Sequence, residues 1–421
     1  MSWRINVRKL GIGVLFVILL FVVCWAGLTN IGFLQFFLKH VDELLTLFFL
    51  VYVALHFQTA YRGNKAICVS WAVILSIGLL SNAIFRYQKA FPALADAFVI
   101  CSRFVVGYLA AYVYCRKLSK RKKSVADAVD RLVKVITTVL FVLALHDTFL
   151  TPLFPVGDYR YFMYSLQLMF PHVTYLSYAG ATLLIFLGYR NNKKTNSHLV
   201  YMLMASYLCF VSLRSKAIGF LFFYWLLYYG LRYVKKRHLG IMILLGTIGA
   251  LIVAWDQIQL TFLVASRYSP RSILLKDSLG LMLKQFPLGT GFGTFGSALA
   301  ATYYSPLYVQ CGYPMNWGMT PGNPMFLSDS FWPTAFAQFG VIGTVLFMGI
   351  VVSFVKKALL KYKYDKRAGF AMLMTLVYLL IVSMAESAFF NPSTLIMIML
   401  FAVFENDRAK PLRVSRRGEI N

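Results

Sequence analysis

Long apolar stretches recur along this chain and constrain its fold more than any other feature. About twelve of them follow one another with short links, and runs such as Ile12–Trp25 are apolar on every face of a helix. A helix of roughly 20 apolar residues crosses the hydrocarbon core of a bilayer and satisfies its own backbone groups there. The pattern predicts an all-α polytopic membrane protein, because the strands of a membrane β-barrel would alternate in hydrophobicity.

The composition agrees with this class of protein. Apolar residues make up 59% of the 421 residues, and the mean hydropathy of +0.68 is typical of a helical membrane protein. Three cations precede Leu10, and the stretch after them is long enough to remain as the first helix. We expect a single integral membrane domain over residues 1–421, with about twelve transmembrane helices near 10–28, 42–60, 66–85, 94–115, 132–150, 172–189, 198–213, 217–233, 239–256, 335–355, 369–386 and 392–404.

The charge distribution predicts the orientation of the chain. The formal net charge is +27, and most of the 42 lysines and arginines fall in alternate links between the expected spans. Cytoplasmic links are enriched in Lys and Arg, so the basic links and both termini are expected in the cytoplasm. The positive charge therefore indicates orientation and contact with anionic membrane lipids, and it does not imply a nucleic-acid partner.

One link is far longer than the others. Roughly 75 residues separate two consecutive spans, and we assign residues 257–334 to a large loop on the outer face. Ser269-Pro270 is typical of a helix start, and residues 271–286 divide into an apolar and a polar side. Such a helix is expected to lie along the membrane surface.

Arginines on the outer face are the first candidates for a site. Ser212-Leu213-Arg214-Ser215-Lys216 places two cations in a tight outer turn, where they either anchor the helices at the headgroups or hold a phosphate. Arg271 lies in the first turn of the expected surface helix, where it opposes the helix dipole unless an anion binds. Because guanidinium groups grip phosphate oxygens in pairs, Arg214, Arg267 and Arg271 are candidate diphosphate ligands.

Few carboxylates are expected on the outer face. Asp329 lies just before a span, in Leu327-Ser328-Asp329-Ser330. Glu386 is expected near the outer end of its helix, where it either transfers protons or hydrogen-bonds the helix end. His146-Asp147 has no second histidine at ligand spacing, so we expect no metal site.

The outer links also contain aromatic residues and glycines. Rings in the large loop either form an interfacial belt or stack on sugars, and the candidates for sugar contact are Tyr303, Tyr304, Trp317 and Trp332, with Arg160 from the outer link 151–171. The glycines at 289, 291, 293 and 296 either end the surface helix in tight turns or let the backbone approach a ligand.

Three motifs occur in an order that resembles a known superfamily. They are the turn Ser212-Leu213-Arg214-Ser215, Arg271 followed by Pro287-Leu288-Gly289-Thr290-Gly291-Phe292-Gly293, and Asp329-Ser330 followed by Gly340-Val341-Ile342-Gly343. Together with the late large loop, they look like the bacterial O-antigen polymerase and O-antigen ligase superfamily. The resemblance covers mainly residues 198–350 and implies a GT-C-like fold in the bacterial inner membrane.

The resemblance implies a glycosyl transfer that needs neither metal nor cofactor, because the undecaprenyl-diphosphate-linked donor is already activated. Arg214, Arg267 and Arg271 would hold the diphosphate, Asp329 would be the base for the acceptor hydroxyl, and Glu386 would be the alternative base. Ligases of the superfamily typically carry histidine where this chain has Asp329. We therefore favour a polymerase of lipid-linked repeat units over a ligase that uses lipid A-core.

The resemblance also implies partners from the same pathway, namely a flippase and a chain-length regulator. A transporter or lipid flippase is the alternative from another class of protein. It would carry internal repeats and charges at the centres of its spans. We find no repeat, and Arg103 is the main charge inside a span.

Overall fold

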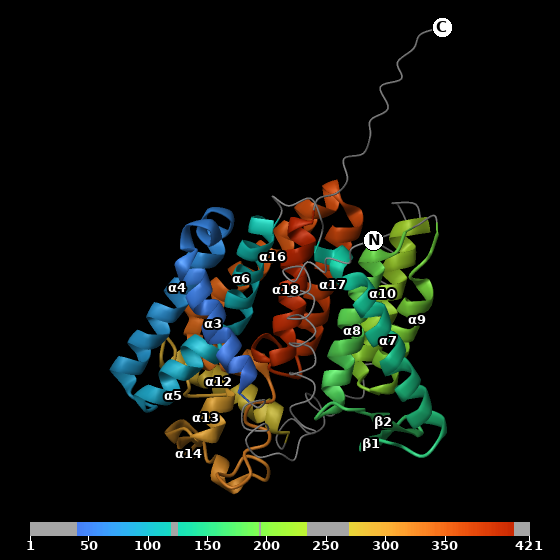
Figure 1. Cartoon of the computed structure of the whole chain (residues 1–421). Coiled ribbons are helices and arrows are strands. Elements are labelled where there is room, and N and C mark those ends of the chain that lie inside the picture. The colour runs from blue at the N-terminus through green and yellow to red at the C-terminus, as the bar shows by residue number, and fades with distance from the viewer. Residues whose placement is uncertain (1–39, 119–124, 193–194, 234–268, 408–421) are drawn as a thin grey trace.

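The computed structural model describes residues 40–118, 125–192, 195–233 and 269–407. These residues are mostly helical, with one two-stranded sheet (Figure 1). The spans expected at 10–28 and 239–256, and Arg267, lie outside the described residues.

The long helices overlap the expected spans. Their bounds are α3 (Val41–Leu55), α4 (Phe57–Phe85), α6 (Arg103–Leu118), α7 (Val125–Phe149), α8 (Val173–Arg190), α9 (Leu199–Val211), α10 (Ser215–Tyr233), α16 (Gly340–Tyr364), α17 (Lys366–Ser383) and α18 (Pro392–Asn406). The short helices are α5 (Ala90–Ala95), η1 (Asp96–Ile100), α12 (Pro270–Lys284), α13 (Ala298–Thr302), α14 (Pro306–Gln310), η3 (Tyr313–Met315), α15 (Phe331–Thr334), η4 (Ala335–Phe339) and η5 (Ala388–Phe390).

Several helices have the properties of membrane spans. Within the described residues, four are long and apolar enough to cross a bilayer: Phe57–Phe85, Val129–Phe149, Phe331–Tyr364 and Lys366–Ser383. The pair Ala90–Ile100 and Arg103–Lys117, bent by 42°, makes a fifth if it is one span. Large apolar side chains such as Phe48, Leu80 and Val142 stay exposed. The described residues therefore support a helical membrane protein, but they do not show the expected number of twelve spans.

The long helices run side by side, and the short loop elements gather at one end (Figure 1). In the bundle, α18 packs against α6 and α17, and α8 packs against α9 and α17. At the lower end of the view lie α12, α13 and α14, together with a hairpin of β1 (Val156–Arg160) and β2 (Met163–Leu166). The hairpin lies in the outer link 151–171. The prediction of an all-α protein was therefore wrong for this link.

Two further details differ from the expected spans. The span expected at 94–115 is broken after η1, and Arg103 begins α6 at this break. Its guanidinium is buried, pairs with Asp42 of α3 at 2.5 Å and donates to the Phe390 carbonyl. The charge of Arg103, which was expected inside a span, is therefore neutralised by Asp42 of a neighbouring helix. In addition, α17 ends at Ser383, so Glu386 lies in the turn beyond it.

The glycine-rich segment after α12 is a buried plug between helices. Gly289, Gly291 and Gly293 all have positive φ, at 81°, 88° and 68°. The Asn82 side chain of α4 bonds the backbone N–H and carbonyl of Phe292, and the Gly293 N–H donates to Asp96 of η1 at 2.7 Å. The backbone of this segment packs against neighbouring helices, as expected for tight turns. We therefore assign no ligand to it.

Because this segment is closely packed, we expect Gly289→Ala to lose much of the protein's stability. A Cβ on Gly289 would lie 2.4 Å from the backbone nitrogen of Gly340, and the positive φ alone costs an alanine about 1–3 kcal/mol. Gly280→Ala in α12 is the control, because a Cβ there meets nothing within 4 Å and should stabilise the helix by about 0.5–1 kcal/mol. Thermal unfolding in detergent measures both, and equal midpoints would contradict the account of the plug.

Candidate functional site

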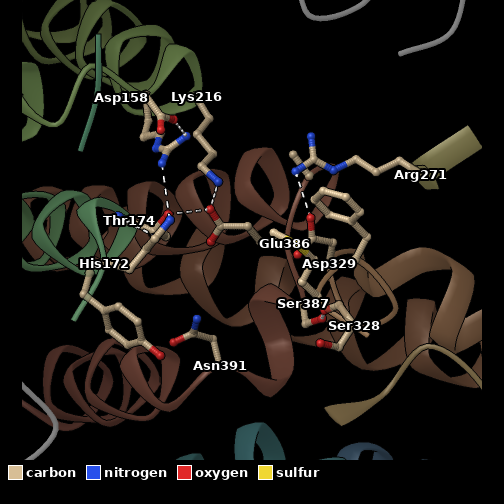
Figure 2. A pocket seen from close by; sticks show the side chains of 15 residues that line it. Asp158, His172, Thr174, Lys216, Arg271, Ser328, Asp329, Glu386, Ser387 and Asn391 are labelled. Carbon is tan, nitrogen blue, oxygen red and sulfur yellow. Dashed lines mark hydrogen bonds and ion pairs between the residues drawn. The ribbon is translucent and has the colours of Figure 1, made fainter. Parts of the chain in front are cut away.

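A cavity of about 590 Å³ opens at the end of the bundle where the loop elements gather. Six separate parts of the chain line it: strand β1, the start of α8, the turn into α10, the start of α12, the loop before α15 and the loop before α18. Its lining residues are Asp158, His172, Thr174, Tyr175, Arg214, Lys216, Arg271, Met325, Phe326, Ser328, Asp329, Ala385, Glu386, Ser387 and Asn391 (Figure 2).

One side of the cavity contains Arg271 and Asp329. Arg271 lies in the first turn of α12, because Pro270 at the first helical position starts the helix there. Its Nη2 lies 3.3 Å from the Asp329 Oδ2, and about a third of each side chain is exposed. Burial raises the pKa of the Asp329 carboxyl above its ordinary value, and the Arg271 guanidinium opposes this shift.

The other side contains a second acid held by a lysine. Lys216 and Glu386 form an ion pair and point toward each other in Figure 2. Thr174 at the start of α8 donates its hydroxyl to the Glu386 Oε1 at 3.0 Å, while the Glu386 Oε2 is buried without a partner among the described residues. An acid with one fixed and one free oxygen can accept a proton or a hydrogen bond from a ligand.

Arg214, in the turn into α10, pairs with the hairpin. Its Nη1 is 3.7 Å from the Asp158 Oδ2, and Arg160 contacts the same carboxylate oxygen at 3.1 Å. The Nε atoms of Arg214 and Arg271 are both buried and unpaired within the described part of the chain. Unpaired buried guanidinium N–H groups are costly, and both of these can donate to an anion in the cavity.

His172 is the only imidazole among the described residues that line the cavity. It caps α8, where its Nδ1 lies 3.3 Å from the Thr174 backbone nitrogen. Its Nε2 lies 3.3 Å from Arg214 Nη2. A neutral imidazole has one acceptor nitrogen, so only one of these two contacts is a hydrogen bond.

The structure brings four of the candidate residues together and leaves others apart. Arg214, Arg271, Asp329 and Glu386 all line the cavity, and Arg160 reaches it through Asp158. The four aromatic candidates do not line it. Tyr303 packs edge-on against Phe91, Tyr304 bonds the Met319 carbonyl and Trp332 bonds Ser383, all outside the lining, whereas Trp317 packs on Phe326, which lines the cavity.

Sequence reasoning left several lining residues out of the site. Lys216 stands in the same turn as Arg214 but is not assigned a role from the sequence, and neither is Asp158, which lies in the same link as Arg160. His172, Thr174 and Asn391 were missed, although each lies at a helix start on the predicted outer side. Their shared position at helix ends of one face was the available signal. Among the described residues, no group of three His, Cys, Asp or Glu side chains is arranged to hold a metal ion.

A scan of this chain against protein-family models found no match, and a search of the curated proteins found none either. The O-antigen polymerase and ligase superfamily is therefore a proposal that depends on the motifs and on the cavity.

Proposed function

We propose that this chain is a polymerase of undecaprenyl-diphosphate-linked oligosaccharide repeat units. It transfers the glycan of one lipid-linked unit to a hydroxyl of another at the outer face of the bacterial inner membrane. Its fold would be GT-C-like with about twelve spans, and it would act together with a flippase and a chain-length regulator. The meeting of Arg214, Arg271, Asp329 and Glu386 in one cavity carries the proposal.

The charge of the helix ends supports the proposed orientation. α8 and α10 begin beside the cavity, and α17 ends beside it. Their other ends carry basic residues, such as Arg190 on α8 and Lys366 and Arg367 on α17. Since cytoplasmic ends are the basic ones, this distribution supports the proposal of a cavity on the outer face, with both termini in the cytoplasm.

The proposed reaction exchanges one bond for another at the anomeric carbon. The acceptor hydroxyl oxygen forms a bond to that carbon, and its proton passes to Asp329, with Glu386 as the alternative acceptor. The bond from the anomeric carbon to the diphosphate oxygen breaks, and its electrons leave with undecaprenyl diphosphate. Charge grows on the diphosphate, so Arg214 and Arg271 would stabilise the transition state more than the bound donor.

The nearest alternative is a ligase that transfers the glycan to lipid A-core. The purified chain, reconstituted with labelled lipid-linked repeats, should form longer lipid-linked glycans without lipid A-core. Product formation only when lipid A-core is present would favour the ligase. Movement of labelled lipid across the vesicle membrane without any new glycosidic bond would favour a transporter or flippase.

Trp317 is the aromatic candidate best placed to contact the glycan. Trp317 is 75% exposed, and its ring packs on Phe326, which lines the cavity together with Asp329. Trp317→Ala should raise KM for the lipid-linked glycan roughly fivefold, as expected for the loss of about 1 kcal/mol of ring stacking. Tyr303→Ala is the control, since Tyr303 is also exposed but contacts Phe91 instead. Equal effects of the two substitutions on KM would argue against a sugar platform at Trp317.

A further inference from the structure

The charges of the cavity cancel in pairs. Three cations and three carboxylates line it within the described residues. Arg271 pairs with Asp329, Lys216 with Glu386, and Arg214 with Asp158. Arg160, which does not line the cavity, also contacts Asp158. A binding site for a diphosphate that is ready to receive its ligand would be expected to carry a net positive charge. These cations instead have carboxylates as partners.

A carboxylate and a phosphate compete for the same donors on a guanidinium. Both accept the paired N–H groups of arginine in the same plane, so the Nη2 of Arg271 that faces Asp329 cannot fully serve a phosphate oxygen as well. The two arginine pairs are also held loosely. The Asp158 side chain is 61% exposed and lies 3.7 Å from Arg214, whereas Asp329 and Arg271 are each 35% exposed. Ion pairs of this exposure contribute little stability, and an incoming dianion can break them.

We propose that Asp329 and Asp158 are internal counter-ions, which a lipid diphosphate displaces from Arg271 and Arg214. This inference rests on the proposed function. Displacement from Arg271 leaves Asp329 without its cation, next to the place where the acceptor hydroxyl must deliver its proton. A carboxylate that loses its cationic partner is a stronger base. The base is therefore activated by the donor, and the donor binds before the acceptor hydroxyl is deprotonated.

The exchange also sets the order of events in the cavity. While the cavity holds no donor, the Arg271–Asp329 pair keeps the carboxylate less basic than it is once Arg271 has left it. After the donor has bound, an acceptor glycan that fills the cavity excludes the water that would otherwise hydrolyse the donor. Glu386, by contrast, is held by both Lys216 and Thr174, and we assign it no exchange.

Removal of a counter-ion should tighten diphosphate binding, and this tests the proposal. The full-length protein in lipid nanodiscs is titrated with farnesyl diphosphate, a short polyprenyl probe. Asp329→Asn and Asp158→Asn should each lower its Kd on the order of three- to tenfold, because the amide no longer competes as an anion. Asp158 lies on an exposed strand, so its variant remains informative if the Asp329 variant folds poorly.

Two control variants separate the possible failures. Asp277→Asn lies on the same helix as Arg271 but bonds Tyr313 outside the cavity, so its Kd should match the wild type. Arg271→Ala should weaken binding. The counter-ion proposal would be overturned if neither Asp329→Asn nor Asp158→Asn bound the probe more tightly than the wild type. If Arg271→Ala still weakened binding in that case, the diphosphate site itself would stand. Absence of any Arg271-dependent binding would overturn the diphosphate site itself.

Discussion

Arg271→Ala is expected to abolish polymer formation. The guanidinium would contact the leaving diphosphate, where negative charge grows as the glycan departs, and loss of such a donor typically costs on the order of 10²- to 10³-fold in rate. A strain that lacks the native gene and carries the variant should display single repeat units in place of long chains. The same loss should appear as a fall in kcat with the reconstituted protein and labelled lipid-linked repeats.

Lys276→Ala is the matched control for this result. Lys276 lies on α12, five residues beyond Arg271, and its side chain is exposed outside the cavity. Its loss removes the same charge from the same helix and should leave polymer length unchanged. Full-length polymer in the Arg271 variant, at wild-type protein level, would end the assignment of this arginine to the diphosphate.

Asp329→Asn should lower kcat on the order of 10²- to 10⁴-fold, the range expected for loss of a general base. The variant differs from Arg271→Ala in one respect: it should still bind the lipid diphosphate while failing to transfer the glycan. If Glu386→Gln causes the loss and Asp329→Asn does not, the base is Glu386. Quantification of new glycosidic bonds at saturating donor distinguishes the two variants.

The pH profile supplies an independent check on Asp329. Burial raises the pKa of its carboxyl, and the group accepts a proton only when it is deprotonated. As the pH falls, the basic form should therefore be lost at a higher pH than for an ordinary aspartate, and kcat should fall with it. The decline should be absent from the residual activity of Asp329→Asn. A profile of the wild type that stays flat down to the ordinary pKa of aspartate would contradict the role.

Sequence reasoning located the helices because their signals are local. Apolar length predicted the spans, and α16, α17 and α18 overlap the expected ranges. Ser269-Pro270 marked the start of α12 within a residue, since the position of proline in the first turn depends only on adjacent backbone geometry. The end of α17 was placed too late, because Met384 and Ala385 continue the apolar run past Ser383 and hydropathy does not register a turn.

The hairpin and the break before α6 could not be predicted in the same way. The β1–β2 pair is short and carries aromatic residues that also suit an interfacial link, so no alternating pattern of useful length marks it. The break at Arg103 is supported by Asp42 and by the Phe390 carbonyl, which are far from it in the chain. Partners of this kind have no local sequence signal.

The chain alone determined that this is a helical membrane protein with arginines and acids on one predicted face, because hydropathy and charge act residue by residue along each helix. Tertiary packing decided which of them share a cavity. Arg214, Arg271, Asp329 and Glu386 come from four separate segments, and only the docking of the α9–α10 turn, α12 and the two loops brings them together. It also decided that these cations face carboxylates, since the distance between two charges in space is not encoded by their separation in sequence.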